Sequence, residues 1–170
     1  MQTAAQEYPV KYRAGLITRS SGLITSTGVS ESSTNILQGQ LVISDTAKNG
    51  VDLPASAFAF KSVYGVVALQ HDKAKNINAN TITYVDEDEL LIVQQGFVAL
   101  TITDTVAKND NLFFVHTAGG DSAIHTYRAD MDTNKASITP IKALEAGTSG
   151  SIIECYVNIY ANIGDTDTDT

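Results

Sequence analysis

The residue types that carry most enzyme chemistry are scarce in this chain, which has three histidines and one cysteine. His71, His116 and His125 do not fall in a His-x-x-x-His or His-Glu-x-x-His spacing, so the sequence predicts no zinc ligand pair. His116 and His125 flank a Gly-Gly turn and could face each other across a hairpin, an arrangement more typical of a surface pair than of a catalytic one.

Cys155 lies within an apolar run, residues 152–157, which predicts a buried strand cysteine. A nucleophilic thiolate would need a base beside it, and the sequence indicates none. The acidic run Asp86-Glu87-Asp88-Glu89 has the carboxylates that hard cations prefer. It lacks the glycine and glutamate spacing of a calcium loop, so we expect a solvated turn between strands at 81–85 and 90–95.

No Gly-x-Ser-x-Gly elbow, phosphate-binding loop or Gly-x-Gly-x-x-Gly fingerprint occurs in the chain. Nothing brings a nucleophile, a base and an oxyanion donor together. The sequence therefore predicts a protein that is not an enzyme and that needs no cofactor and no metal.

Composition limits the partners of this 170-residue chain. With 43% hydrophobic residues it can bury a core, and its formal net charge of −8 disfavours binding to nucleic acid. No apolar run approaches the roughly 20 residues that span a bilayer, so we expect no membrane association. The N-terminus lacks the pattern of a signal peptide, which predicts synthesis in a cytoplasm.

The elements that would position any site are predominantly strands. Alternating or buried apolar segments separated by turn clusters predict strands at 10–16, 41–43, 64–69, 81–85, 89–102, 112–115 and 151–160. Residues 53–60 are the best helical candidate, as a single turn with Pro54 at its first position. The pattern predicts a mostly β fold, a compact antiparallel barrel or sandwich.

The chain divides into an N-terminal arm at 1–10, a β-rich domain at 11–162 and a disordered acidic tail at 163–170. The Ser-, Thr- and Gly-rich stretch 19–34 is expected to be an extended loop or arm. A faint internal repeat aligns 41–47 with 112–118, each after a polar turn. Two similar β subunits within the fold would explain it, and chance similarity between turn-strand-turn segments is the alternative.

Four segments carry a resemblance: Tyr8-Pro9-Val10-Lys11-Tyr12-Arg13-Ala14-Gly15-Leu16, Leu37-Gln38-Gly39-Gln40-Leu41-Val42, Val63-Tyr64-Gly65-Val66-Val67-Ala68-Leu69 and Gln95-Gly96-Phe97-Val98-Ala99-Leu100. In this order they resemble the structural cement, or capsid decoration, proteins of tailed bacteriophages, over roughly residues 8–160. The resemblance implies a virion protein on the outer face of the capsid. Such a protein would form homotrimers and clamp neighbouring major capsid subunits, which would stabilise the head.

Within this reading, capsid contacts are expected from polar segments that the core does not need, and trimer contacts from apolar strand faces. The capsid-contact candidates are Gln6, Tyr8, Pro9 and Arg19; the trimer-contact candidates are Phe97, Phe113 and Phe114. Ordinary core packing is the alternative role of the three phenylalanines. The alternative functions are a β-rich tail, fibre or baseplate module for host recognition, and a small β-barrel nucleotide hydrolase, for which the sequence offers neither placed carboxylates nor a nucleotide loop.

Overall fold

The computed structural model describes residues 13–45, 50–70, 82–119 and 123–161, and these form β-strands joined by turns. The elements are β1 (Ile17–Val29), β2 (Ile36–Leu37), β3 (Leu41–Asp45), β4 (Gly50–Asp52), the 3₁₀ turn η1 (Phe60–Ser62), β5 (Val63–Val67), β6 (Thr83–Tyr84), β7 (Glu89–Thr101), β8 (Asn111–Val115), β9 (Tyr127–Arg128), β10 (Ala136–Ala143) and β11 (Ile152–Asn158).

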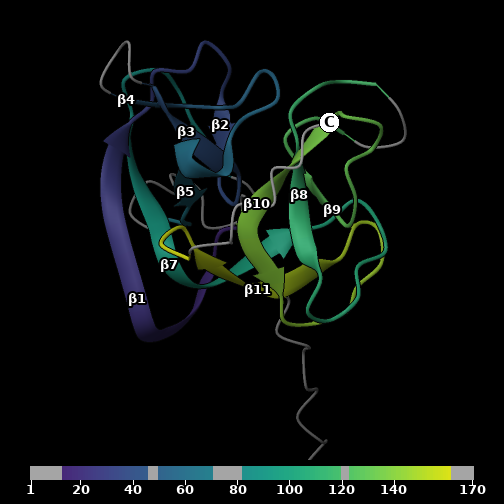
Figure 1. The fold of residues 1–170 in the computed structure, drawn as a ribbon. Helices are drawn as coiled ribbons and strands as arrows, with labels where there is room; N and C mark the ends of the chain where they lie inside the picture. The colour runs from purple at the N-terminus through teal and green to yellow at the C-terminus, as the bar shows by residue number, and fades with distance from the viewer. Residues whose placement is uncertain (1–12, 46–49, 71–81, 120–122, 162–170) are drawn as a thin grey trace, which may run out of the picture.

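One nine-stranded sheet contains all of the strands except β2 and β6, which pair with each other. Its order is β4-β3-β5-β7-β11-β10-β8-β9, and β1 pairs with β7 beside this path. Every pairing between these strands is antiparallel. The 13-residue β7 links the two ends of the sheet, and Figure 1 shows it curving from beside β1 toward β11.

The sheet contains the same strand arrangement twice. We call β1, β3, β4, β5 and the first half of β7 the first unit, and the second half of β7 with β8 to β11 the second unit. The spatial order in the first unit is β4-β3-β5-β7-β1, and in the second it is β9-β8-β10-β11-β7. If the five strands of each unit are numbered in chain order, both units have the spatial order third, second, fourth, fifth, first.

Hydrogen bonds match between the units as closely as the strand order does. A single parallel bridge joins Ser30 to Val51 in the first unit and Ile102 to Tyr127 in the second. In each unit the next residue along donates its N–H to the same partner, Glu31 to the Val51 carbonyl at 2.9 Å and Thr103 to the Tyr127 carbonyl at 2.8 Å. This register makes Val51 and Tyr127 corresponding residues.

The turn before the second strand of each unit also repeats. The N–H of Gln40 donates to the Leu37 carbonyl, and the N–H of Asp110 donates to the Ala107 carbonyl, both at 3.2 Å. Gly39 (φ 81°) and Asn109 (φ 74°) hold the left-handed position, which glycine and asparagine tolerate best. The structure thus aligns Gln40 with Asp110. This differs by one residue from the sequence alignment of 41–47 with 112–118.

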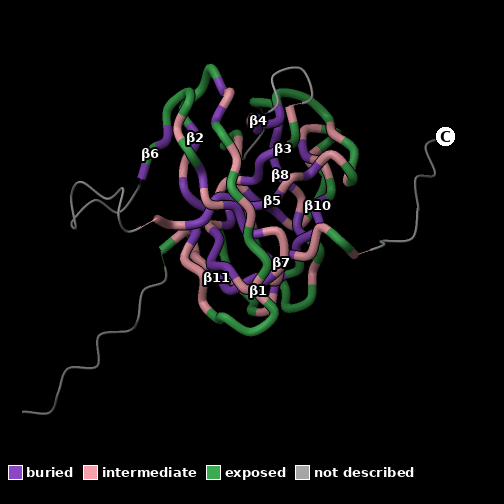
Figure 2. The backbone as a smooth tube through the Cα atoms, turned by 90° about the vertical axis from the view of Figure 1, so that its left-hand side faces the viewer, coloured by how far each residue is buried: buried purple, intermediate pink, exposed green. Residues whose placement is uncertain are grey.

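Two groups of buried side chains lie between the strands. The larger group draws on both units and includes Leu41, Leu100 and Phe114; the smaller joins the first unit to the pair β2 and β6 and includes Tyr84 and Ile92. Figure 2 shows the buried segments gathered inside, with exposed residues at the turns. β7 supplies side chains to both groups and has consecutive buried residues at 98–100.

The predicted mostly β, antiparallel fold is confirmed, with four corrections. Within the described residues the strands do not close into a barrel. In each unit the first strand and the third strand approach each other, but within the described ranges a single bridge is all that joins them. The stretch 19–34 is not a loop, since most of it belongs to β1, whose backbone pairs with β7. Residues 53–60 contain no helical turn before Phe60, where η1 begins.

The predicted strand at 10–16 is also corrected where it can be seen, because residues 14–15 form a turn in which the Leu16 N–H donates to the Arg13 carbonyl at 3.1 Å. The strand begins at Ile17 instead. Residues 10–12 lie outside the described residues, as do the predicted arm at 1–10 and the whole of the predicted tail at 163–170.

Candidate functional site

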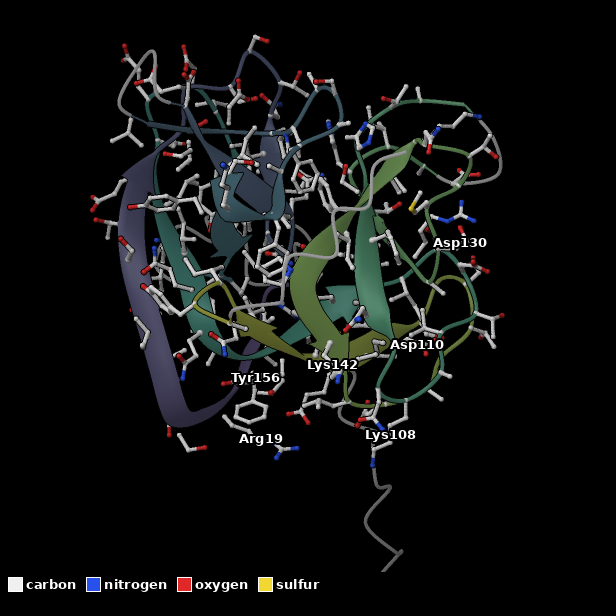
Figure 3. The ribbon with its side chains drawn as sticks, in the orientation of Figure 1. Arg19, Lys108, Asp110, Asp130, Lys142 and Tyr156 are labelled. Carbon is white, nitrogen blue, oxygen red and sulfur yellow. The ribbon has the colours of Figure 1, made fainter. Side chains whose placement is uncertain are left out.

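Five side chains lie opposite one another across five neighbouring strands. Arg19 of β1 is paired with Phe97 of β7, Phe97 with Tyr156 of β11, Tyr156 with Lys142 of β10, and Lys142 with Asn111 of β8. Directly opposed residues of a sheet project to the same face. We call these five residues the cross-strand row, and Figure 3 shows Arg19, Tyr156 and Lys142 along one side of the molecule.

The row lies on the face of the sheet that is turned away from the larger core. Its sequence neighbours Val98, Cys155 and Leu112 project to the opposite face and are fully buried. Within the row, Arg19, Lys142 and Asn111 are exposed, and Phe97 and Tyr156 are half-buried. The aromatic centre of the row is therefore reachable from solvent and has a cationic residue on either side.

Contacts within the row hold its aromatic centre in place. The rings of Phe97 and Tyr156 have centroids 5.1 Å apart. The Arg19 guanidinium lies 4.8 Å from the centroid of the Phe97 ring, within cation–π range. A stacked guanidinium and a pair of rings lose little rotamer freedom on binding, which favours their use as an interface.

Beneath the row, Glu154 fixes the start of β1 to β11. The Thr18 hydroxyl donates to Glu154 Oε1 at 2.5 Å, Arg19 Nε donates to the same oxygen at 3.0 Å, and Arg19 Nη2 donates to Oε2. Burial alone would raise the pKa of the Glu154 carboxyl, but the hydrogen bonds from Arg19 and Thr18 and the Arg19 charge lower it overall. The carboxylate therefore stays ionised and orients Arg19 over Phe97.

The groups considered for catalysis each pack against other side chains. His116 packs edge-on against Phe58 with ring centroids 6.1 Å apart, and His125 stacks on Phe114 at 6.0 Å. Burial lowers the pKa of both imidazoles. Cys155 is fully buried, as predicted, and burial raises the pKa of its thiol. His71 lies outside the described residues.

The acidic run forms the predicted turn between β6 and β7. Asp88 Oδ2 accepts the Val85 N–H at 2.9 Å, and Glu87 adopts φ 67°. No group of three or more His, Cys, Asp or Glu side chains in the described ranges is arranged to hold a metal ion. The described part also contains no helix with the length and hydropathy needed to cross a membrane.

The structure places the predicted contact residues unequally. Arg19 and Phe97, selected for different roles, lie together in the row. Phe113 is half-buried and lies two residues from Asn111, on the same face of β8 as the row. Phe114 is fully buried against Tyr127, so it has no surface to offer a neighbouring copy. Gln6, Tyr8 and Pro9 lie outside the described residues.

Sequence reasoning missed three members of the row: Tyr156, Lys142 and Asn111. The alternation within 151–160 contained a signal for Tyr156, because a strand that buries Cys155 must turn Tyr156 to the other face. Lys142 carried no such signal, since its strand includes Pro140 and was not predicted.

A pocket of about 380 Å³ lies in the first unit, between β1 and the pair β3 and β4. It is lined by Thr27, Gly28, Ser44, Asp45, Gly50 and Val51, with Tyr64 beside them. We call it the seam pocket, because it lies where the two edges of the first unit approach each other. Among the described residues that line it, Asp45 is the charged one.

These features define a class of protein: a rigid antiparallel β scaffold whose surface offers an aromatic and cationic row and whose described histidines and cysteine are packed apart. The comparisons make the assignment specific. The sequence matches the family model described as structural cement protein (E217 gp24/Pam3 gp6) over residues 1–158. The chain belongs to this family, and it is a structural, non-enzymatic, capsid-decorating component of a phage virion.

A solved capsid structure shows the same fold at low sequence identity. A chain in the capsid of Myoviridae phage XM1 superposes with a TM-score of 0.67 at 14% identity, covering 93% of this chain and 97% of that chain. The N base of head fiber gp8.5 in bacteriophage phi29 has a TM-score of 0.45 at 14% identity, covering 81% of this chain and 95% of that chain. No curated protein matches the sequence significantly.

Proposed function

We propose that this cement protein binds the outer surface of the phage head and bridges neighbouring major capsid subunits, which stabilises the shell. The observation that carries the proposal is the repeated unit, with its matching strand order and hydrogen bonds. Two similar scaffolds within one chain provide two places from which contacts to separate subunits can be made.

Bridging gains strength from the rigid connection between the units. Both run through β7, and the Tyr127 hydroxyl of the second unit donates to the Gly39 carbonyl before β3 at 2.9 Å. Once one unit is bound, the other is held close to its own target, so that modest contacts combine into tight attachment. The negative net charge favours an outer position, away from packaged nucleic acid.

The test compares heads with and without the protein. Purified protein is added to heads that lack it, and the temperature of DNA release is followed with a fluorescent dye. Bridging predicts release at a higher temperature and, by electron microscopy, density lying across the boundary between two capsid subunits. Density confined to one subunit, with no change in release temperature, would contradict it.

Self-association through the face of the cross-strand row is a further part of the proposal, with a homotrimer as the expected form. Half-buried Phe97, Phe113 and Tyr156 share this face and would lose their remaining exposure at a subunit contact. Light scattering on the purified chain should give three times the monomer mass. Phe113→Ser should lower that mass, whereas Thr148→Ser in an exposed turn should leave it unchanged; a monomeric wild type would refute trimer formation.

A further inference from the structure

The outer edge of β1 presents backbone groups that no described strand pairs with. Leu91 accepts the Ala68 N–H through its carbonyl at 2.8 Å, so the Leu91 backbone groups point toward β5. Thr27 lies directly opposite Leu91, and opposed residues of an antiparallel pair point either toward each other or both away. The N–H and carbonyl of Thr27 therefore point away from β7, along the edge that borders the seam pocket.

In the second unit the corresponding edge is occupied. Ala99 lies opposite Glu154, whose carbonyl accepts the Leu144 N–H at 2.9 Å, so Ala99 occupies the place that Thr27 has in the first unit. The Gly15 N–H donates to the Ala99 carbonyl at 2.8 Å, and the Ala99 N–H donates to the Leu16 carbonyl at 2.9 Å. The turn at residues 14–15, just before β1, thus bonds to this edge of the second unit.

The side chains also leave the first unit open and fill the second at the place where the first and third strands of each unit approach each other, which we call the seam. Ser44 is paired with Val51 in the first unit, where Phe114 is paired with Tyr127 in the second. The two aromatic rings pack with centroids 5.1 Å apart and are buried in the core. The smaller pair leaves the seam pocket open beside Thr27, whose carbonyl accepts the side-chain hydroxyls of Tyr64 and Ser26, each at 3.3 Å.

We infer that an extended segment of a capsid protein adds to the outer edge of β1 at Thr27, antiparallel to β1, with one side chain in the seam pocket. The inference rests on the proposed function and names the contact that one unit makes. Strand addition supplies main-chain hydrogen bonds for affinity and a pocket for selectivity. Charged residues and proline commonly block pairing at an edge strand, and residues 20–30 contain neither.

The capsid protein is favoured over a second copy because Gly15 and Leu16 of each copy are already bonded to Ala99 of their own chain. The segment that a second copy would offer to this edge is therefore already bonded within its own chain. The net charge of −8 favours a basic side chain on the incoming segment over an acidic one.

Two variants test the inference by different routes. Thr27→Pro removes the outward N–H and is compatible with an edge strand whose N–H faces solvent. Ser44→Phe fills the seam pocket with the side chain that the second unit carries at the corresponding place. Ser149→Phe, in an exposed turn distant from the pocket in sequence, is the control for an added aromatic ring. Each protein is titrated onto empty heads that lack cement protein and is quantified by cosedimentation, after urea denaturation has shown it folded.

Both variants should bind the heads roughly tenfold more weakly, the effect of losing about one net hydrogen bond with its packing, while Ser149→Phe binds like wild type. Wild-type affinity in both variants would overturn the inference and leave the proposed function standing. Wild-type protein that does not sediment with heads would overturn the proposed function itself. A loss of self-association by light scattering with unchanged head binding would assign the edge to a second copy and reject the capsid segment.

Discussion

Replacing Arg19 by alanine removes the main partner of a buried carboxylate. The Glu154 side chain is 5% exposed and the Arg19 side chain is 56% exposed. The substitution deletes two hydrogen bonds to the carboxylate and the stacking over Phe97, and it leaves the bond from Thr18 in place.

The expected loss of stability follows from these contacts. A hydrogen bond to a charged group contributes about 1.5–3 kcal/mol, and an exposed cation–π contact about 0.5–1 kcal/mol. Solvent screening of the half-exposed guanidinium reduces the sum, so we expect the free energy of unfolding to fall by about 2 kcal/mol. For a chain of this size, that lowers the melting temperature by about 4–8 °C.

Urea denaturation of wild type, Arg19→Ala, Glu154→Gln and the double variant measures this coupling. Lys108→Ala, which removes an exposed cation from a turn, is the matched control and should change stability by less than about 0.5 kcal/mol. If Arg19→Ala also stays below about 0.5 kcal/mol, or if the two single losses simply add, Arg19 does not stabilise the fold through Glu154.

The same pair predicts a pH dependence. The pKa of Glu154 is lowered in the folded protein from its ordinary value of 4.5. Its stabilising contribution is therefore complete above that ordinary value and is lost as the pH falls through the folded pKa. The stability difference between wild type and Arg19→Ala should be largest at neutral pH and should shrink on acidification; a difference that grows in acid contradicts the ion pair.

Three further predictions concern backbone space, the link between units and the thiol. Gly65→Ala should destabilise the protein by about 3 kcal/mol or more in urea denaturation, because Gly65 has φ 151° and a Cβ there would lie 2.5 Å from the Val93 carbonyl oxygen; a fully stable variant would contradict this. Tyr127→Phe should reduce stability by about 1–2 kcal/mol, since the buried Gly39 carbonyl loses its hydroxyl donor, and unchanged stability would remove that hydrogen bond from the account. Cys155 should react with a thiol reagent only at the rate of unfolding, because burial both hides the thiol and raises its pKa, and immediate labelling of native protein would contradict its burial.

The strands that the sequence predicts well are those with a strong apolar pattern. β3, β5, β7, β8 and β11 carry buried or alternating apolar residues that follow turn clusters, so their local patterns are sufficient. β1 was expected to be a loop because its Ser, Thr and Gly residues have little apolar periodicity. Its pairing with β7 supplies the backbone partners, and such long-range pairing is not visible in a local pattern.

β10 was missed for a different reason. Pro140 cannot donate to a ladder, and its presence argues against a central strand. The structure accommodates it where β10 changes register against β8, between Ile138 and Lys142. Lys142, and with it one end of the cross-strand row, could not be placed without that strand.

The row itself depends on registers that contain irregularities. Arg19 and Phe97 meet because β1 shifts its register against β7 on both sides of Arg19. A regular ladder extended from Val29 and Glu89 would place a different residue opposite Phe97. The sequence was therefore sufficient to select Arg19 and Phe97 as candidates, but it could not predict that they lie opposite each other.

The two units show how one backbone can serve two purposes. Their strand order and seam hydrogen bonds match because main-chain pairing depends little on which side chains are present. The side chains were free to diverge, and they did so at the seam, where Phe114 and Tyr127 fill the second unit and Ser44 and Val51 leave the first unit open. A filled seam adds buried apolar area and stiffens the scaffold, whereas an open one lowers stability and retains an edge for a partner. We therefore expect substitutions at the second seam to act mainly on folding and those at the first mainly on binding.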